Sequence, residues 1–451
     1  MNAAPAQPVI EEQHRETTKF RWLVFAVFLL ALVVRLAFFF GAQVDYPIRG
    51  DIIQYVNYAW NMIHHGTFSS AEPGVAQPSP DAFRGPGYPA FLAVWMWLAG
   101  AGQSWYTMAV MAQIVLGGLL APLTIAWTRL WLPRGAALAA GFLAALWPHA
   151  IVLASTLLSE TLFCALLLLF LCLAGLTKRF GGAHRGAAAG LVGGLAYLVN
   201  PVIAFFPPMV AALLFLRMQR RAAMAMVAVF LLVAGGWSAR NAMHPGMQGA
   251  WDRAAANLVE GSWPLFHSAL NARFEYKSAS EMVAAVGAEE RLMSRSPRAG
   301  FHSMFARFSD YPVDYARWYL LEKPYSLWGW WIGVGWGDVY FLETSNSPFD
   351  RQLVFRLIHE GYRYANPFFF GLAVFATLYA FARYRRDHSS EAFSLLMAAG
   401  FFWYVTGIHT LLQAEPRYSV AYRPMEVALA VTAFLKIWHS LTARRRHQPK
   451  K

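Results

Sequence analysis

Charged residues are scarce in this sequence. Only 14% of its 451 residues are charged, whereas 57% are hydrophobic and 16% are aromatic. Uninterrupted apolar runs approaching about 20 residues, the length that crosses a bilayer as a helix, recur along the chain. A soluble globular domain does not have this composition. We therefore predict a membrane protein with several spans.

Cysteine is almost absent as well. The chain has two, Cys164 and Cys172, both in one apolar run, which leaves no disulfide framework and no thiolate zinc site. The sequence also contains no GxSxG, Walker or Rossmann motif, and no spacing of histidines or acids that requires a metal. Soluble nucleotide cofactors are therefore not expected, while a divalent cation at the site stays open.

Positive charge exceeds negative charge, with 38 Lys and Arg against 25 Asp and Glu and a formal net charge of +13. The basic residues form short clusters between apolar runs, as in the cytoplasmic loops of multi-pass membrane proteins. Nucleic-acid binding would instead require a basic face on a soluble domain. We therefore expect membrane lipid, and no nucleic acid, as a partner.

The apolar runs predict an all-α polytopic fold with about ten transmembrane helices. The expected spans are 22–41, 106–128, 135–150, 160–177, 187–200, 201–216, 222–239, 367–383, 392–412 and 421–440. Basic clusters follow alternate spans, which places both termini in the cytoplasm.

Whether the segment 86–102 crosses the membrane decides on which side the N-terminus and the first loop lie. At about 1.5 Å per residue it is short for a hydrocarbon core of roughly 30 Å, so we expect a helix that lies in the external interface. The alternative has the segment crossing the membrane, with an external N-terminus and eleven spans. That topology also fits the basic clusters, and it would move Asp51 to the cytoplasm.

The predicted topology divides the chain into five parts. They are a cytoplasmic tail (1–21), an N-terminal transmembrane module (22–239) with a catalytic first external loop (42–105), an external or periplasmic domain (240–366), C-terminal transmembrane helices (367–440) and a basic cytoplasmic tail (441–451). The external domain is more polar than its surroundings and is expected to be mainly helical. Its Gly-rich aromatic stretch, 328–336, is expected at the bilayer surface.

Two charged residues of the first external loop are candidates for chemistry. Asp51 precedes an apolar-periodic stretch, where a carboxylate also occurs as an ordinary helix-start signal. Arg84 precedes Gly85-Pro86-Gly87, a loop whose backbone can approach a ligand, and a guanidinium suits phosphate oxygens. The alternative for Arg84 is an arginine that snorkels to lipid headgroups.

Two further candidates lie at external turns far along the chain. Glu160 opens a predicted span, where it either serves the site or simply stabilises a helix N-terminus. Arg417, in Glu415-Pro416-Arg417-Tyr418, is external and so runs against the positive-inside trend, which argues for an anionic partner. The alternative is an ion pair between Arg417 and Glu415.

In their order along the chain, these residues resemble the C-type membrane glycosyltransferases that use polyprenyl-phosphate sugars. The closest resemblance is to bacterial relatives of the protein O-mannosyltransferases and of the lipid A aminoarabinose transferase. It rests on Gly50-Asp51 with Tyr55, Arg84 to Pro89, Ser159-Glu160, Trp237 with Arg240-Asn241, and Glu415 to Tyr418. One departure is that Asp51 is followed by Ile52-Ile53, where protein mannosyltransferases often have adjacent acids.

The resemblance implies an inverting transfer of a sugar from a polyprenyl-phosphate donor to an acceptor hydroxyl on the external face of the bacterial inner membrane. The acceptor would be lipid A or lipopolysaccharide, another envelope glycan, or a protein. Asp51 would lie at the reaction centre as the catalytic base. Partial burial against aromatic rings would raise its pKa and strengthen it in that role.

Six further residues are expected to bind substrate. They are Glu160, Arg84, Tyr88, Tyr55, Arg417 and Tyr418. Within this set, Arg84 and Arg417 would hold the phosphate. The sequence identifies neither the sugar nor the acceptor.

A second class of function remains open at this stage, namely a transporter or flippase for lipid-linked saccharides. Such a protein would favour internal repeats and interrupted helices, and the sequence has no visible repeat. The two classes differ in one geometric expectation. An enzyme requires Asp51, Arg84 and Glu160 to converge on one external cavity.

Overall fold

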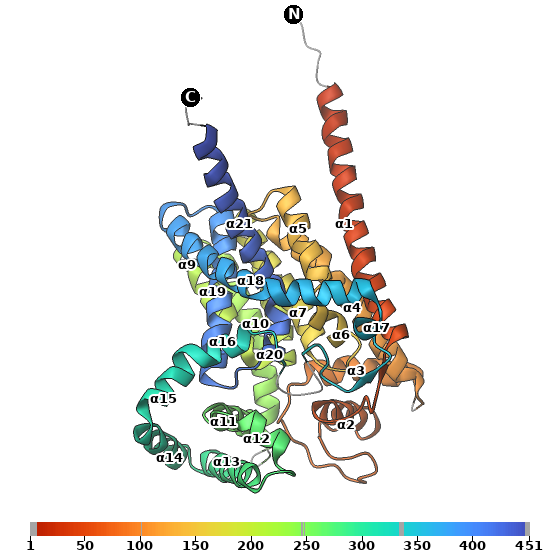
Figure 1. The fold of residues 1–451 in the computed structure, drawn as a ribbon, viewed down its shortest axis with the longest axis vertical. Helices are drawn as coiled ribbons and strands as arrows, with labels where there is room; N and C mark the ends of the chain where they lie inside the picture. The colour runs from red at the N-terminus through yellow and green to blue at the C-terminus, as the bar shows by residue number, and fades with distance from the viewer. Residues whose placement is uncertain (1–6, 101, 245–246, 248, 333–337, 447–451) are drawn as a thin grey trace, which may run out of the picture.

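The computed structural model describes residues 7–100, 102–244, 247, 249–332 and 338–446. Nearly all regular structure in these ranges is helical (Figure 1). The helices that coincide with predicted spans are α1 (Gln7–Gly41), α4 (Ser104–Thr128), α5 (Arg134–Ala145), α7 (Glu160–Phe180), α8 (Ala183–Val199), α9 (Phe206–Leu216), α10 (Arg220–Ala242), α18 (Leu353–Arg386), α19 (Ser390–Leu411) and α21 (Arg423–Arg446). The predicted all-α membrane fold is confirmed.

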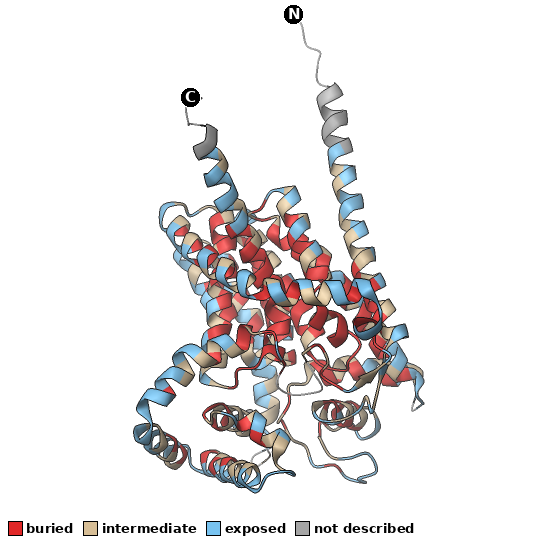
Figure 2. Cartoon of the chain, in the orientation of Figure 1, coloured by how far each residue is buried: buried red, intermediate tan, exposed pale blue. Residues whose placement is uncertain are grey.

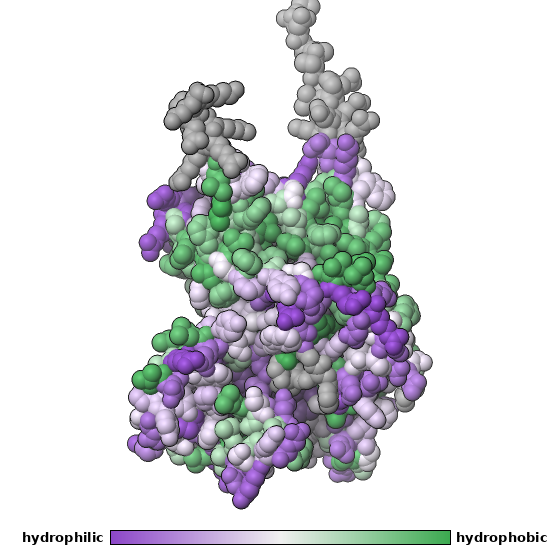
Figure 3. Space-filling model, in the orientation of Figure 1, coloured by the Kyte–Doolittle hydropathy of each residue, from purple (hydrophilic) through white to green (hydrophobic). Residues whose placement is uncertain are grey.

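Six of these helices, α1, α4, α7, α10, α18 and α19, are long and apolar enough to cross a membrane. The start of α1 and the end of α21 lie at the same end of the bundle. On the face seen in Figure 3, a hydrophobic surface covers much of the bundle, and the opposite end of the molecule carries more hydrophilic residues. This arrangement is what the predicted spans require.

The remaining helices lie outside the bundle or connect its members. The first loop contains α2 (Asp51–His64) and α3 (Gly87–Ala99). The large insert contains α11 (Ala250–Gly261), α12 (Phe266–Ala272), α13 (Lys277–Arg295), α14 (Pro297–Asp310), α15 (Pro312–Arg317), the π-helical turn η2 (Trp318–Glu322), α16 (Lys323–Trp328) and α17 (Pro348–Arg351). Short connecting helices are α6 (Pro148–Leu153), η1 (Pro201–Ile203), α20 (Pro416–Ser419) and η3 (Val420–Tyr422).

Helix α3 has 13 residues, which at 1.5 Å per residue gives a length of about 20 Å. That is shorter than a hydrocarbon core of roughly 30 Å. Its first turn packs against the end of α8, because a Cβ on Gly87 would lie 2.8 Å from the main-chain carbon of Leu198. The helix therefore lies at the same end of the bundle as α2 (Figure 1).

Two predicted spans differ from the helices observed. The span predicted to begin at Pro367 is the second half of α18, which has 34 residues and contains that proline. The predicted start at Pro367 thus lies inside a continuous helix, where a proline is tolerated when neighbouring elements satisfy the freed backbone groups. The span predicted at 135–150 is interrupted, since α5 ends at Ala145 and α6 begins at Pro148. Proline at the first turn of α6 accounts for the break.

The aromatic stretch expected at the bilayer surface is mostly buried where the structure describes it. Trp328 is 2% exposed and stacks on Phe402, with ring centroids 4.4 Å apart. Trp330 is also buried, whereas Trp331 is 59% exposed. The expectation is thus wrong for the two buried tryptophans, and its part at 333–336 lies outside the described residues.

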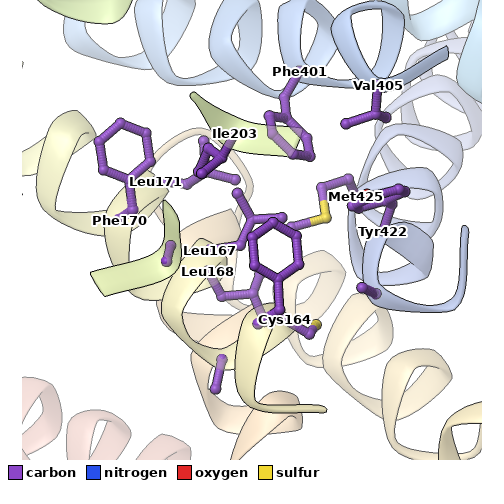
Figure 4. Close-up of a cluster of buried hydrophobic side chains, with 14 of the residues drawn as sticks. Cys164, Leu167, Leu168, Phe170, Leu171, Ile203, Phe401, Val405, Tyr422 and Met425 are labelled. Atoms are coloured by element: carbon purple, nitrogen blue, oxygen red, sulfur yellow. The ribbon is translucent and has the colours of Figure 1, made fainter. Parts of the chain in front are cut away.

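A continuous core joins the helices that meet beneath the external end of the bundle (Figure 2). In its centre, Leu167 and Leu168 of α7 lie against Phe401 of α19 and Met425 of α21 (Figure 4). Fully burying a large apolar side chain contributes about 1.5–3 kcal/mol. This packing fixes the external ends of α7 and of the segment that leads into α21.

The insert has a small core of its own, built on α11, α12 and α13. It docks on the bundle at the end of α11, where a Cβ on Gly261 would lie 2.0 Å from the main-chain oxygen of Leu412. Only glycine permits this approach. The amine of Lys323 donates to the carbonyl oxygens of both residues. A two-stranded antiparallel ladder, β1 (Gln43–Val44) with β2 (Thr344–Ser345), adds a second link.

Candidate active site

Four charged side chains from distant parts of the chain form one ion-pair cluster. Asp51, the first residue of α2, accepts from Arg84 Nη2 at 2.7 Å through Oδ1 and from Arg417 Nη2 at 2.9 Å through Oδ2. Arg417 Nε donates to Glu160 Oε1 at 2.9 Å. The sequence predicted all four as site residues, and the structure brings them into direct contact.

The loop that carries Arg84 is fixed by its contact with α8. A Cβ on Gly85 would lie 2.4 Å from the main-chain oxygen of Leu198, so the glycine permits close contact with α8. Gly85 also lines the apolar groove described below, and the predicted approach of this backbone to a ligand remains a prediction. Arg84 is 8% exposed and also donates through Nε to Gln54 Oε1 at 2.6 Å. The side chain is therefore held inside the protein and does not snorkel to headgroups.

Arg417 is fixed from both sides. Its guanidinium carbon lies 4.1 Å from the ring centroid of Phe341, a favourable cation–π geometry. The predicted alternative, a pair between Arg417 and Glu415, is not what forms. Glu415 Oε1 lies instead 3.1 Å from His267 Nε2, so Arg417 is left to the two carboxylates of the cluster.

The three predicted tyrosines occupy different places. The hydroxyl of Tyr55 lies 3.4 Å from the hydroxyl oxygen of Ser159, and its ring lines the cavity described below. Tyr418 also lines this cavity and donates to Gln413 Oε1 at 2.6 Å. Tyr88 does not line it, because its side chain is fully buried and donates to Gln113 Oε1 at 2.8 Å. Tyr88 thus supports the site from the core.

A polar cavity of about 230 Å³ opens against this cluster. One wall carries Asp51, Arg84, Glu160 and Arg417. The opposite wall is one face of α11 in the insert. The residues of that face are Arg253, Ala256, Asn257 and Glu260. The cavity is therefore enclosed between the membrane bundle and the external insert.

The α11 residues were not selected as site residues from the sequence. Arg253, Asn257 and Glu260 are spaced i, i+4 and i+7, which places them on one helix face. This spacing was the available signal, but the insert contains many charged residues and nothing local shows which face meets the bundle. The contact at Gly261 supplies that information.

Arg253 differs from the other two arginines of the cavity. Within the described part of the chain its guanidinium forms no hydrogen bond and no ion pair, whereas Arg84 and Arg417 each bind a carboxylate. Burial lowers the pKa of Arg253, and the positive charge of Arg84 lowers it further. An arginine nevertheless stays protonated at neutral pH. The cavity thus contains one unpaired cation.

The two arginines have a strong effect on Asp51. Burial alone would raise the pKa of its carboxyl, but Arg417 and Arg84 outweigh burial and hold that pKa well below its usual range. The predicted rise in pKa is therefore wrong. Two guanidinium groups stabilise the charged form more than the loss of water destabilises it.

An apolar groove of about 400 Å³ adjoins the polar cavity. Its apolar lining includes Phe205, Trp237, Ile408 and Leu412. Arg84, Arg253, Asn200, Asn257, His409, Gln413, Tyr418 and Phe83 line both the groove and the cavity. The unpaired cation thus lies where polar and apolar spaces meet.

Arg240 and Asp81 brace the first loop against α10. Arg240 donates to the carbonyl oxygen of Asp81 at 2.9 Å and to that of Phe68 at 3.3 Å. The Asp81 carboxylate accepts from the backbone amide and the hydroxyl of Ser70, at 2.7 Å each. Arg240, part of the resemblance noted in the sequence, therefore holds the loop and lines neither space. Among the described residues no group of three His, Cys, Asp or Glu is arranged to hold a metal.

Comparisons with known proteins gave matches only among solved structures. No protein-family model matches the sequence, and no curated protein matches it. The chain aligns over 94% of its length with 51% of the apo oligosaccharyltransferase of Archaeoglobus fulgidus, at 14% identity and a TM-score of 0.50. It aligns over 97% of its length with 52% of the oligosaccharyltransferase AglB from the same organism, in complex with an inhibitory peptide and a dolichol-phosphate, at 15% identity and a TM-score of 0.50.

ArnT from Cupriavidus metallidurans, bound to undecaprenyl phosphate, aligns with 93% of the chain over 77% of its own length, at 16% identity. Its TM-score of 0.38 does not establish a common fold. The chain spans about half the length of the oligosaccharyltransferase. At these identities the likeness establishes the fold alone, which is the helical membrane fold of an oligosaccharyltransferase.

Proposed function

We propose that this protein is an inverting glycosyltransferase that moves a sugar from a polyprenyl-phosphate donor to an acceptor hydroxyl. The observation that carries the proposal is the position of Arg253. Its unpaired guanidinium lies where the polar cavity meets the apolar groove. A lipid phosphate has the matching chemistry, with an anionic headgroup and a hydrocarbon chain.

The charges of the cavity suit departure of a phosphate. A polyprenyl phosphate leaves as an anion, so it needs cations rather than a protonating acid. Arg253 supplies a full positive charge. Arg84 uses Nη2 for Asp51 and Nε for the amide oxygen of Gln54, and Arg417 uses Nη2 for Asp51 and Nε for Glu160. A guanidinium has five N–H donors. Each of them therefore retains Nη1 for a phosphate oxygen.

Asp51 and Glu160 fix the two paired arginines in place. Both oxygens of Asp51 are bound, one by each arginine, so the carboxylate sets the distance between the two guanidinium groups. Such preorganisation removes the cost of gathering like charges during the reaction. The role of base predicted for Asp51 remains a prediction, and its depressed pKa weighs against that role in this state.

The apolar lining of the groove supports a membrane-borne donor. The elements that line the cavity lie at the end of the bundle opposite the start of α1 and the end of α21. With both termini in the cytoplasm, as the basic clusters suggest, the site faces the periplasm of a bacterial inner membrane. The acceptor is then a hydroxyl of lipid A, another envelope glycan or a protein. A single displacement at the anomeric carbon, without an enzyme nucleophile, inverts its configuration.

The test is transfer by the purified protein in lipid nanodiscs. Short-chain polyprenyl phosphates, each carrying one radiolabelled sugar, are supplied with an envelope extract as the source of acceptors. We expect the wild type to label a glycolipid, glycan or protein. Asp51→Asn should lower the rate of transfer by at least about 100-fold, because Arg84 and Arg417 lose the carboxylate that holds them in position. Asp310→Asn, an exposed aspartate of α14, is the matched control.

Mass spectrometry of envelope glycolipids and glycoproteins from cells lacking the gene then names the sugar and its acceptor. A glycan that disappears on deletion and returns with wild type, but not with Asp51→Asn, supports the proposal. Passage of the lipid-linked sugar across vesicles without covalent transfer would overturn it in favour of a flippase.

A further inference from the structure

The proposed reaction requires a group that accepts a proton. As the acceptor oxygen bonds to the anomeric carbon, the hydroxyl must lose its hydrogen, and the departing phosphate is held as an anion by arginines. Three carboxyl groups line the cavity, those of Asp51, Glu160 and Glu260. The base is expected to be the carboxyl that no guanidinium group binds.

Two of the three are committed to arginines. Asp51 uses one oxygen for each arginine of the cluster. Glu160 uses Oε1 for Arg417, and its Oε2 is buried without a partner and inaccessible to solvent. A carboxylate bound by guanidinium groups has a lowered proton affinity. Neither group is a good acceptor for a proton in this arrangement.

Glu260 has a different environment. It lies two turns of α11 beyond Arg253, a separation of about 10 Å along the helix, and it faces the cavity opposite Asp51. The side-chain amide of Gln413 donates to its Oε2. No cation contacts this carboxyl within the described residues.

The carboxyl of Glu260 also meets that of Glu290 on α13. Glu260 and Glu290 lie close enough for each carboxyl to shift the pKa of the other, and Glu290 is partly exposed at the surface of the insert. Two carboxyl groups in contact do not both ionise, so they share a proton. The pair therefore links the cavity to external water.

We propose that Glu260 is the catalytic base of the transfer and that Glu290 passes the proton from it to external water. The inference rests on the proposed function. In this step the acceptor O–H proton moves to the Glu260 carboxylate while the acceptor oxygen bonds to the anomeric carbon. The bond from that carbon to the phosphate oxygen breaks, and its electron pair stays on the phosphate held by Arg253.

The electrostatic surroundings agree with this role. Burial, which is the largest cause, and the neighbouring carboxyl of Glu290 together raise the pKa of Glu260 to about 8. A base with a pKa near the working pH is the most effective one. The charged or titratable groups that share the cavity with Glu260 or shift its pKa are Glu290 of α13, Asp51 and Tyr55 of α2, Arg84 of the first loop, Glu160 of α7, His409 of α19, Glu415, Arg417 and Tyr418 around α20, Tyr422 of η3, and Arg253 of α11 itself.

The pH dependence of kcat/KM tests the proposal, since the base must be unprotonated. For wild type we expect kcat/KM to rise with pH up to about 8 and then level. Glu260→Gln should lower it by about 100-fold or more and remove the rise. Glu290→Gln removes the neighbouring carboxylate, so the same rise should move to lower pH.

Glu281→Gln, an exposed acid on the same helix as Glu290, is the matched control and should keep the wild-type profile. Binding of unsubstituted polyprenyl phosphate shows whether Glu260→Gln retains a formed site. A Glu260→Gln profile like wild type would overturn the inference, as would an unshifted rise in Glu290→Gln. Wild-type inactivity on every donor would instead overturn the proposed function itself.

Discussion

The arginines of the cavity differ in what they are bound to, and this difference predicts their roles. Arg84 and Arg417 are neutralised by Asp51 and Glu160, and both belong to a network that fixes the external end of the bundle. Arg253 has no such partner among the described residues. Replacing a paired arginine leaves a buried carboxylate uncompensated, which is strongly destabilising. Replacing Arg253 does not.

Arg253→Ala should therefore weaken binding of polyprenyl phosphate without a loss of thermal stability. Hydrogen bonds to a charged group contribute about 1.5–3 kcal/mol, which corresponds to roughly 10- to 150-fold in the dissociation constant. Equilibrium binding in nanodiscs measures this change. Arg253→Lys keeps the charge but loses the planar fork, so its affinity should lie between those of alanine and wild type.

Arg298→Ala, an exposed arginine at the start of α14, provides the control for a general loss of positive charge. It should bind like wild type. Equal affinities for wild type and Arg253→Ala would show that the phosphate is held elsewhere.

Individual residues were predictable where they contrast with their surroundings. Asp51, Arg84, Glu160 and Arg417 are charges in or beside apolar segments, where a charge is costly and needs a reason. Glu260 lies in a polar insert with many acids, so its charge gives no such signal. Its importance depends on the docking of α11, a contact between residues about 150 positions apart, Gly261 and Leu412.

Helices, like single residues, were predictable in some places and not in others. Helices with continuous apolar periodicity were found close to their observed bounds, because burial in the bundle and in lipid imposes the pattern. Both predicted spans that differ from the structure begin at or contain a proline. Pro367 lies inside α18, and Pro148 begins the short α6 where one span was expected. A proline inside a helix is tolerated when neighbouring elements satisfy the freed backbone groups, which a single sequence does not reveal.

The docking of the insert depends on a buried lysine. Lys323 is fully buried, and its amine donates to the Gly261 carbonyl oxygen at 2.9 Å and to that of Leu412. Burial lowers its pKa to about 7, whereas an unfolded lysine has a pKa of about 10.4. Between these values the unfolded state binds more protons than the folded state, so stability should rise with pH. Below pH 7 both states are protonated and this dependence ends.

Thermal unfolding of the purified protein at pH 6, 7, 8 and 9 checks this. The part of the pH dependence due to Lys323 should disappear in Lys323→Met, which keeps an unbranched chain of similar length. Lys277→Met, at a lysine that is 91% exposed, should retain the wild-type dependence. A stability that falls from pH 7 to pH 9 through Lys323 would contradict the prediction.

The whole molecule combines a membrane bundle that supplies one wall of the cavity with an insert that supplies the other. Neither wall alone has both the fixed arginines and the unpaired one. Closure of the insert over a lipid-borne donor would exclude water from the reacting atoms and strengthen every electrostatic contact there. The geometry requires the first loop, the insert and the turn around α20 to share one side of the membrane.

That requirement predicts a labelling pattern. The two native cysteines lie in α7 and are replaced by alanine. Single cysteines at His65, Gln103 and Ser280, all exposed, should react with a membrane-impermeant maleimide added to intact spheroplasts. A cysteine at Ala183, exposed in the turn between α7 and α8, should react only after permeabilisation. His65 precedes α3 and Gln103 follows it. Labelling of only one of the two would mean that α3 crosses the membrane. Asp51 and the insert would then lie on opposite sides. Their joint labelling with Ser280 follows if a helix of about 20 Å cannot span a hydrocarbon core of roughly 30 Å.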